Sequence, residues 1–332
     1  MASRFSRTPT SRKKGYSIMK RFKRALVTGG AGFIGSHLVE ELVANQCRVT
    51  VLDNLSTGHL YNIDHLADHI DFVEGDIRDA ALLDQVTAGC EVVFHLAAVV
   101  SVTQSVEDPS HACEVNDLGT VRVLDACRRS SVRRVVMASS SAVYGDDPRL
   151  PKTEDMVPRP LSPYAVQKLS GELYAAVFGQ LYGLETVCLR YFNVFGPRQD
   201  PSSPYSGVIS IFMTKAAAGQ PPTIYGDGGQ TRDFVYVKDV VRANLAAATE
   251  PAAAGRIYNV GIGTSITIGE LWEMIADIAG TAMVPVFAPP RPGDIRDSVS
   301  DIKAIGGSLG FAPRVKLRKG LEITLDWVRN GR

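Results

Sequence analysis

Short apolar runs alternate with longer amphipathic stretches from residue 24 to about residue 195. The runs are rich in valine, isoleucine and leucine, and they span residues 25–28, 49–52, 71–74, 92–96, 135–139 and 186–191. Continuous apolar runs of this length are typical of strands buried on both faces of a parallel sheet. With right-handed crossovers through the intervening helices, the pattern predicts an α/β fold, a Rossmann-like doubly wound parallel sheet.

The pattern changes after residue 195. Residues 196–204 form a loop by composition, and the remainder mixes short strands, helices and proline–glycine turns. We therefore expect an NAD-binding Rossmann domain over residues 24–195, which also takes in part of 235–262. A smaller α+β substrate-binding domain is expected to occupy most of residues 196–332.

The composition is that of an ordinary globular enzyme, with 45 % hydrophobic and 21 % charged residues in a chain of 332. No window approaches eighteen consecutive apolar residues, so no membrane partner is expected. The 5 cysteines are scattered without a C-x-x-C pair. They indicate reduced thiols, a cytoplasmic location and no metal site.

The positive charge is concentrated at the start of the chain. Residues 1–24 hold nine lysines or arginines and no acidic residue, so the net charge of +1 leaves −8 for the remainder. The segment is rich in serine and has no apolar signal core. We expect residues 1–23 to be a disordered basic extension, with no nucleic-acid partner.

A glycine-rich turn follows the first apolar run. Gly29, Gly32 and Gly35 recur at intervals of three, which permits a tight turn and a close backbone approach to phosphate oxygens. The next predicted strand ends in Asp53, whose carboxylate can accept the ribose hydroxyls of a dinucleotide. Residues 54–58 contain no cation that could hold a 2′-phosphate, so the sequence favours NAD over NADP.

A tyrosine and a lysine stand four residues apart, downstream of three serines. A free tyrosine has a pKa of about 10, too high for a general base at neutral pH. On one helix face, Lys168 can lie beside Tyr164 and stabilise its phenolate. Ser162 and Pro163 indicate the cap and first turn of that helix. A hydroxyl from residues 139–141 can bridge the reacting alcohol to the phenol.

Together these motifs resemble those of the extended short-chain dehydrogenase/reductases. The resemblance covers residues 24–330 and is carried by Thr28 to Gly35, Asp76-Ile77, His95-Leu96-Ala97-Ala98, Asn116, Ser139 to Gly145, Tyr164 to Lys168 and Arg190-Tyr191-Phe192-Asn193. Within that family the chain is most similar to the UDP-hexose 4-epimerases, above all to those acting on UDP-N-acetylglucosamine. That similarity lies in Tyr225 to Gly228, Thr231 to Phe234 and Arg291 to Asp294.

The resemblance implies tightly bound NAD and a UDP-sugar substrate. The implied cofactor-binding residues are Gly29, Gly32, Phe33, Ile34, Gly35, Asp53, Asn54, Ser56, Thr57, Gly58, Asp76, Ile77, Leu96, Ala97, Ala98, Asn116, Ser139, Tyr164, Lys168, Tyr191 and Phe192. The implied substrate-binding residues are Ser101, Ser141, Asn193, Gly207, Val208, Thr223, Tyr225, Arg232, Arg291, Asp294 and Ser298. Among these, Asn193 and the two arginines would hold the UDP, since guanidinium groups suit a pyrophosphate.

The family's chemistries differ in the residues that follow the catalytic hydroxyl. All share a first step, in which the tyrosine takes the proton of the sugar 4-hydroxyl while the C4 hydride passes to NAD. The 4,6-dehydratases then use an Asp-Glu pair, and the sugar-acid decarboxylases a glutamate. Counted back from Tyr144, the hydroxyl is Ser140 and the next two positions are Ser141 and Ala142. Without an acid or base there, the simplest outcome is 4-epimerisation, with NAD retained.

The resemblance also bears on the sugar. In UDP-galactose 4-epimerases of narrow specificity, a tyrosine four residues after the Arg-x-Gly-Asp aspartate limits the pocket, and that position is Ser298. The smaller side chain predicts interconversion of UDP-GlcNAc and UDP-GalNAc, with UDP-Glc and UDP-Gal as a further pair.

Several alternatives stay open. Ser141 could supply the catalytic hydroxyl instead of Ser140, and the chain could be a UDP-glucuronate epimerase or decarboxylase. It could also be a non-catalytic NAD-binding protein whose basic extension contacts RNA. The resemblance implies a homodimer through helices around residues 119–129 and 162–182. We expect His95 to pack at a strand end rather than to transfer protons.

Overall fold

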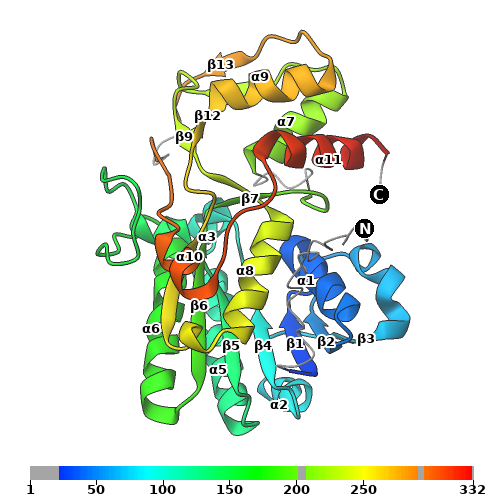
Figure 1. The fold of residues 1–332 in the computed structure, drawn as a ribbon, viewed down its shortest axis with the longest axis vertical. Helices are drawn as coiled ribbons and strands as arrows, with labels where there is room; N and C mark the ends of the chain where they lie inside the picture. The colour runs from blue at the N-terminus through cyan, green and yellow to red at the C-terminus, as the bar shows by residue number, and fades with distance from the viewer. Residues whose placement is uncertain (1–21, 201–206, 291–294, 331–332) are drawn as a thin grey trace, which may run out of the picture.

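A seven-stranded parallel sheet forms the lower part of the molecule (Figure 1). The computed structural model describes residues 22–200, 207–290 and 295–330. The strands lie in the order β11-β6-β5-β4-β1-β2-β3, and each neighbouring pair is parallel. Their bounds are β1 (Arg24–Thr28), β2 (Arg48–Asp53), β3 (Ile70–Glu74), β4 (Val92–His95), β5 (Arg134–Ser140), β6 (Glu185–Tyr191) and β11 (Arg256–Val260). The predicted Rossmann-like sheet is confirmed.

Helices cover both faces of this sheet. One face carries α1 (Phe33–Ala44), α8 (Val237–Thr249) and α10 (Lys303–Leu309), and the other carries α2 (Ala80–Thr87), α5 (Gly119–Arg129) and α6 (Pro163–Tyr182). Adjacent residues of β1 point to opposite cores: Val27 packs with α1 and α8, and Leu26 with α2 and α5. Because helices cover both faces, the inner strands are largely apolar, which is the pattern that identified them, whereas the edge strand β3 keeps Asp71 and Glu74 exposed.

The connection between β4 and β5 is built from short helical segments. These are α3 (Val102–Glu107), α4 (Pro109–Cys113) and a π-helical turn (Glu114–Leu118) that leads into α5. Short 3-10 turns lie at Leu60–Asn62, Asp64–His69, Ser141–Tyr144 and Pro251–Ala253. A π-helical turn inside a longer helix is often found at a functional site, and this one faces the carboxyl end of β4 through Asn116.

The upper part of the molecule has its own apolar core. Its helices are α7 (Val208–Ala217), α9 (Ile268–Ala279) and α11 (Leu317–Asn330). Three small sheets pair β7 (Asn193–Phe195) with β10 (Phe234–Tyr236), β9 (Thr231–Arg232) with β12 (Ile266–Thr267), and β8 (Thr223–Tyr225) with β13 (Val286–Ala288). Phe212 and Trp272 meet edge to face at 5.5 Å between α7 and α9. This core is separate from the two that flank the large sheet.

The chain crosses between the two parts repeatedly. After β7, it forms α7 and β8 above, returns through α8 and β11 to the large sheet, and goes back up to α9. Later, α10 packs Ile305 and Leu309 into the core beneath α8. Within the described ranges, no helix has the length and apolar character needed to cross a membrane.

Candidate active site

A cleft of about 930 Å³ opens at the carboxyl ends of the parallel strands. Its walls come from the glycine turn after β1, the ends of β2 to β6 and the start of α6. All of the cofactor residues predicted from the sequence line it, except Asn116. In an open α/β sheet this edge is where ligands bind. The structure thus brings the motifs of six separate strands to one surface.

The glycine turn leaves its backbone bare toward this cleft. Gly29 has φ +72°, and a Cβ there would lie 2.8 Å from the Ala97 nitrogen. At Gly35 a Cβ would lie 2.1 Å from the Gly29 carbonyl oxygen, so any side chain would push α1 away from the turn. Gly29 N–H also donates to the Leu52 carbonyl at 2.8 Å, which fixes the turn on β2. Such a cradle fits the pyrophosphate of a dinucleotide.

Asp53 holds the glycine turn to the end of β2. Its two carboxylate oxygens accept the N–H groups of Ala31 and Leu55, each at 2.9 Å. Burial raises the pKa of Asp53, although these two bonds act in the opposite direction. Each oxygen keeps a second lone pair, and the residue lines the cleft. Asp53 can therefore brace the turn and accept ribose hydroxyls together.

Arg78 is a cation in the cleft wall that the sequence analysis missed. Its guanidinium pairs with Asp76 at 2.9 Å and with Glu114 at 3.0 Å. The bond from Arg78 lowers the pKa of Asp76 to about 2. Two carboxylates thus neutralise the cation that could otherwise attract a 2′-phosphate, which agrees with NAD as the cofactor. The Asp-x-Arg sequence at the end of β3 was the available signal.

The start of α6 is confirmed where the sequence placed it. The Ser162 hydroxyl accepts the Ala165 N–H at 3.2 Å as the helix cap, and Pro163 occupies the first position. The next N–H, that of Tyr164, donates to the Ser105 hydroxyl on α3 at 3.1 Å. Since Ser105 is completely buried, α3 anchors the backbone that carries the candidate base.

Ser140, Tyr164 and Lys168 come together in the cleft. The Ser140 hydroxyl lies near enough to the Tyr164 phenol to lower its pKa, and Lys168 Nζ lies 5.7 Å from the centre of the Tyr164 ring. Lys168 also donates to the Ala138 carbonyl at 2.9 Å, which holds it against β5. Ser141 does not line the cleft and begins a 3-10 turn. Of these two serines, the geometry favours Ser140 as the catalytic hydroxyl.

Burial acts in opposite directions on the two titratable members of the triad. It raises the pKa of the Tyr164 phenol, against the smaller effect of the Ser140 hydroxyl. It lowers the pKa of Lys168 to about 8, which leaves the ammonium largely charged at neutral pH. A phenolate at Tyr164 therefore requires the positive charge placed beside it.

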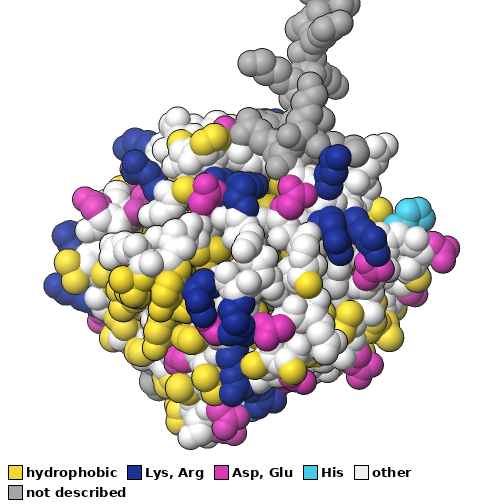
Figure 2. All heavy atoms as spheres, turned by 90° about the horizontal axis from the view of Figure 1, so that it is seen from below, with side chains coloured by type: hydrophobic (Ala, Val, Ile, Leu, Met, Phe, Trp, Pro, Cys, Tyr) yellow, Lys and Arg dark blue, Asp and Glu magenta, His cyan; other side chains and the backbone are white. Residues whose placement is uncertain are grey.

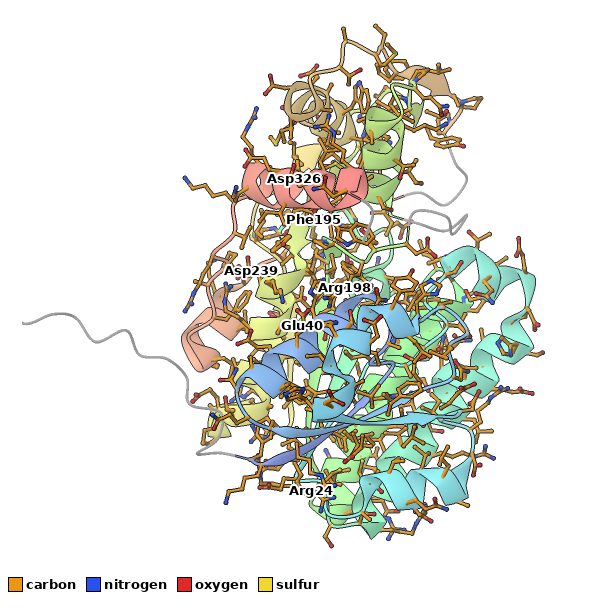
Figure 3. The ribbon with its side chains drawn as sticks, turned by 90° about the vertical axis from the view of Figure 1, so that its right-hand side faces the viewer. Arg24, Glu40, Phe195, Arg198, Asp239 and Asp326 are labelled. Atoms are coloured by element: carbon orange, nitrogen blue, oxygen red, sulfur yellow. The ribbon has the colours of Figure 1, made fainter. Side chains whose placement is uncertain are left out.

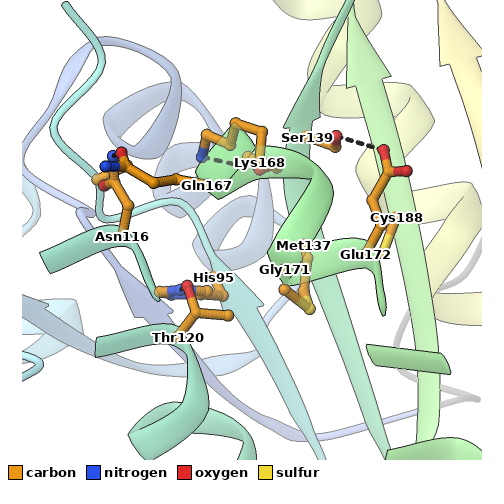
Figure 4. Close-up of a pocket in the computed structure, with 12 residues that line it drawn as sticks. His95, Asn116, Thr120, Met137, Ser139, Gln167, Lys168, Gly171, Glu172 and Cys188 are labelled. Atoms are coloured by element: carbon orange, nitrogen blue, oxygen red, sulfur yellow. Dashed lines mark hydrogen bonds between the residues drawn. The ribbon is translucent and has the colours of Figure 1, made fainter. Parts of the chain in front are cut away.

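Beside Lys168 lies a small cavity lined by both polar and apolar residues (Figure 4). His95 spans part of it, with Nδ1 2.8 Å from the Thr28 hydroxyl and Nε2 3.0 Å from the Thr120 hydroxyl. Burial lowers the pKa of His95 to about 3, so the ring is neutral. His95 does not line the large cleft. This position supports a packing role rather than proton transfer.

Asn116 also lies at this cavity, although it was predicted to touch the cofactor. Its Oδ1 accepts the Val99 N–H at 2.8 Å, and its Nδ2 donates to the Val99 carbonyl at 3.0 Å and to Gln167 at 2.7 Å. The amide thus ties the loop after β4 to α6. In this structure Asn116 supports the cleft from below and does not line it.

A buried ion pair that was not predicted from the sequence lies next to Ser139. Glu172 on α6 and Arg190 on β6 form a two-point pair at 2.9 and 2.7 Å. Both side chains are almost inaccessible to solvent. The Ser139 hydroxyl donates to Glu172, as the dashed line in Figure 4 marks. The pair therefore fixes Ser139 and joins β5, β6 and α6 around Lys168.

The predicted substrate residues are more widely spread. Ser101 and Gly207 line the large cleft, whereas Ser141, Asn193, Val208, Thr223, Tyr225, Arg232 and Ser298 do not. Bonds to the carbonyl groups of Thr231 and Asp233, two residues apart, nevertheless hold three of them near one another. Asn193 donates to the Asp233 carbonyl at 3.2 Å, and Ser298 N–H and Arg232 Nη1 donate to the Thr231 carbonyl at 3.2 and 2.8 Å. Arg291 and Asp294 lie outside the described residues.

Other chemistry receives no support from the described part of the chain. It contains no group of three or more His, Cys, Asp and Glu side chains that could hold a metal ion. Its cysteines are free thiols, of which Cys113 is exposed and the other four are buried.

The architecture and the motifs match known proteins along almost the whole chain. The model of the NAD dependent epimerase/dehydratase family matches residues 25–261, a span that ends one residue after β11. A UDP-glucose 4-epimerase from Mycolicibacterium smegmatis is 44 % identical over 312 residues, covering 92 % of this chain and 99 % of the relative.

Two solved structures have the same fold. A UDP-N-acetylglucosamine 4-epimerase from Methanobrevibacter ruminantium, in complex with UDP-N-acetylmuramic acid, superposes with a TM-score of 0.90 at 40 % identity. The match covers 94 % of this chain and 100 % of that one. A UDP-glucose 4-epimerase from Thermus thermophilus, in complex with NAD, gives a TM-score of 0.85 at 42 % identity, covering 93 % and 100 % of the two chains.

Proposed function

The chain belongs to the NAD dependent epimerase/dehydratase family, and we propose that it interconverts the C4 epimers of UDP-hexoses. UDP-GlcNAc and UDP-GalNAc are the proposed main pair, and UDP-Glc and UDP-Gal a second pair. The observation that carries the proposal is a triad of Ser140, Tyr164 and Lys168 with no acid or base following the serine.

The side chains of the triad have distinct tasks. Tyr164 takes the proton of the sugar 4-hydroxyl and later returns it, while Ser140 holds the reacting oxygen by a hydrogen bond. Lys168 supplies the positive charge that lowers the pKa of the phenol. When bound in the cleft, NAD supplies an acceptor for the C4 hydride and gives it back. The glycine turn and Asp53 are the residues proposed to hold it.

The positions of the carboxylates that line the described part of the cleft favour epimerisation over dehydration or decarboxylation. The described residues that line the cleft include three carboxylates, Asp53, Asp76 and Asp200. The first two lie at the ends of β2 and β3, and Asp200 faces His59. Glu172 is committed to Arg190 and to Ser139. None is placed to remove a proton from C5 of a sugar held at Tyr164.

The preference for an acetylated sugar is proposed from Ser298. This half-buried residue lies on the segment joined to β9 by its N–H bond to Thr231. A serine leaves space that a tyrosine would fill, and an N-acetyl group needs such space. The Methanobrevibacter ruminantium neighbour, which is named for UDP-N-acetylglucosamine, supports the same choice.

The proposal is tested by incubating the purified protein with each UDP-sugar in separate reactions, without added NAD, and separating the C4 epimers. We expect conversion of UDP-GlcNAc and UDP-Glc in both directions. Turnover of UDP-glucuronate alone, with release of carbon dioxide or a change at C4, would replace the proposal by its main rival. No turnover of any UDP-sugar by a folded protein that contains NAD would refute it.

We further propose that two copies associate through α5 and α6. Figure 2 shows apolar side chains gathered on one side of the molecule, and α6 exposes Val166, Leu173, Val177 and Leu181 to solvent by 45 to 68 %. These positions share one helix face. Two such faces could form a four-helix interface. Sedimentation at micromolar concentration should give a dimer, and Leu173→Glu should give a monomer; a monomeric parent protein would overturn this proposal.

A further inference from the structure

Glu40 on α1 gathers basic side chains from three separate segments. Its carboxylate pairs with Lys238 of α8 at 2.8 Å and with His65 at 3.0 Å. It also pairs with Arg198, in the loop that follows β7. Figure 3 shows Glu40 and Arg198 directed toward each other across the gap between α1 and that loop. The Glu40 carboxylate thereby joins α1 to three other segments of the chain.

The cluster is partly shielded from water. The side chains of Glu40 and Arg198 are 25 % and 18 % exposed, respectively. Burial by itself would raise the pKa of Glu40, but the bonds from His37, Lys238 and Arg198 outweigh it and hold that pKa far below its usual range. Glu40 is therefore an anion throughout the neutral range. Partly buried ion pairs of this kind hold geometry better than those on an open surface.

Other contacts hold the loop that follows β7 against α1 and against the segment after β2. The Pro197 carbonyl oxygen lies 2.9 Å from His37 Nε2 on α1, and Asp200 lies 3.5 Å from His59. Arg198 has φ +68°, a left-handed conformation that is strained for a non-glycine residue. A strained residue persists only where its surroundings hold it, and here those surroundings are α1 and its carboxylate.

The loop forms part of the cleft wall. Arg198, Gln199 and Asp200 line the same cleft as the glycine turn. The second guanidinium nitrogen of Arg198, Nη1, is buried and has no hydrogen-bond partner within the described part of the protein. A buried cationic donor without a partner is costly unless a ligand completes it. The pyrophosphate of a dinucleotide, with two negative charges, has the required chemistry.

We propose that Glu40 is a positioning residue that keeps the dinucleotide resident by holding Arg198 and residues 196–200 over the cleft. The inference rests on the proposed function, because only an enzyme that restores its cofactor in each turnover gains from never releasing it. Without the carboxylate, Arg198 would lose its anchor and the strained loop would relax away from the cleft. Bound NAD would then exchange with solution.

A purely structural role for Glu40 can be separated from this one. The pair with Lys238 ties α1 to α8 without involving the loop, so Lys238→Met removes the helix contact alone. Arg198→Met removes the loop contact together with the Nη1 donor proposed for the pyrophosphate, whereas Glu40→Gln weakens both pairs and leaves that donor in place. Glu41→Gln is the matched control on the same helix, since Glu41 contacts only its neighbour Asn45 among the bonds described.

The test measures NAD in the purified proteins and its rate of release into NAD-free buffer, with no sugar present. We expect Glu40→Gln and Arg198→Met to release NAD about 10-fold faster, the size of a typical coupling between sites. Lys238→Met and Glu41→Gln should match the parent protein. Excess NAD should restore epimerase turnover to the two fast-releasing variants, and the NAD-free variants should melt at the temperature of the NAD-free parent, which separates faster release from a general loss of stability.

Two results would overturn the inference. One is release of NAD by Glu40→Gln at the parent rate; the other is equally fast release by Lys238→Met, which would make Glu40 a structural tie. Should Glu40→Gln fail to fold, Glu40→Asp takes its place, because the shorter side chain withdraws the carboxylate from Arg198 while the charge on α1 and the Arg198 donors remain. Since release is measured without sugar, a protein that holds NAD but epimerises nothing would refute only the proposed function.

Discussion

The dinucleotide cleft and the proposed sugar-nucleotide region are built in different ways. The cleft collects the ends of parallel strands that all point to one edge of a single sheet. Four of the proposed sugar-nucleotide residues instead lie on strands only two or three residues long, namely Asn193, Thr223, Tyr225 and Arg232. Arg232 and Ser298 are far apart in sequence, and each is held by a bond to the Thr231 carbonyl.

Because the two regions are built differently, we expect the first to determine the reaction and the second to determine which sugar is accepted. The sheet fixes the cleft through two buried cores, so the residues that handle the cofactor and the proton have little freedom to change. The short strand pairs depend on a few backbone bonds, and a side chain such as Ser298 can change with little effect on the sheet. Mutations in the first region should abolish the reaction, whereas those in the second should redirect it.

The largest effect is expected in the first region, from Tyr164→Phe. Loss of the phenol removes the general base, so kcat should fall by about 10²–10⁴-fold, while NAD content stays constant because the ring remains. Tyr174→Phe, at an exposed position of the same helix, is the matched control and should be fully active. Epimer formation followed by chromatography provides the measurement. Unchanged turnover in Tyr164→Phe would show that the triad is wrongly assigned.

A smaller and selective effect is expected in the second region, from Ser298→Tyr. The larger ring should occupy the space of the N-acetyl group, lowering kcat/KM for UDP-GlcNAc by about 10–200-fold and sparing UDP-Glc. Ser298→Ala serves as the control and should keep both activities. Parallel kinetics with the two sugars provide the measurement. An equal loss with both sugars would place Ser298 in the general architecture of the site instead of in specificity.

In the first region, Lys168→Met should show that the buried lysine lowers the stability of the fold. Burial lowers the Lys168 pKa from 10.5 to about 8. Between these values the unfolded chain binds more protons than the folded one, so stability rises with pH there. Below pH 8 the lysine is charged in both the folded and the unfolded state, so this gain in stability is absent. An inactive Lys168→Met variant should therefore melt about 2–4 °C higher at pH 7 and lose the rise between pH 8 and 10.5.

The measurement is thermal unfolding of both proteins after removal of NAD, because cofactor binding would stabilise the parent alone. Lys303→Met changes a lysine that is 90 % exposed and should leave Tm unaltered. A variant that melts lower than the parent at pH 7 would show that Lys168 stabilises the fold through its bond to Ala138.

The smallest effect is expected from removing residues 1–18, which belong to neither region. Turnover and NAD content should both stay at the level of the full chain, because the residues of the proposed site all follow residue 28. Kinetics of the shortened protein provide the measurement. A loss of activity would contradict the disordered-extension hypothesis and bring the basic segment into the function.

The sequence was most informative where its signals were local. Continuous apolar runs revealed six strands of the sheet, because both faces are buried, and Ser162 with Pro163 located the start of α6. The glycine spacing and Tyr164 with Lys168 indicated the cofactor and the base. Each of these features lies within a few residues of the element that it defines.

Long-range contacts left no comparable signal. Glu172 and Arg190 look like ordinary charged residues in the sequence, and only the packing of α6 on β6 makes them a buried pair. Asn116 matched a family position, but its amide turns to Val99 and Gln167 instead of the cleft. Strands of two or three residues are too short for a periodic pattern, so the geometry around Arg232 and Ser298 could not be predicted.

The return of the chain to the sheet at β11 limits how the protein can be synthesised. A nascent chain that ends at residue 195 already carries the whole triad, yet β6 lacks its outer neighbour and one face lacks α8 and α10. Unpaired edges and bare apolar faces attract other chains and chaperones. Stalled nascent chains should therefore resist protease only once α10, which ends at Leu309, has left the ribosome, and protection at residue 195 would contradict this.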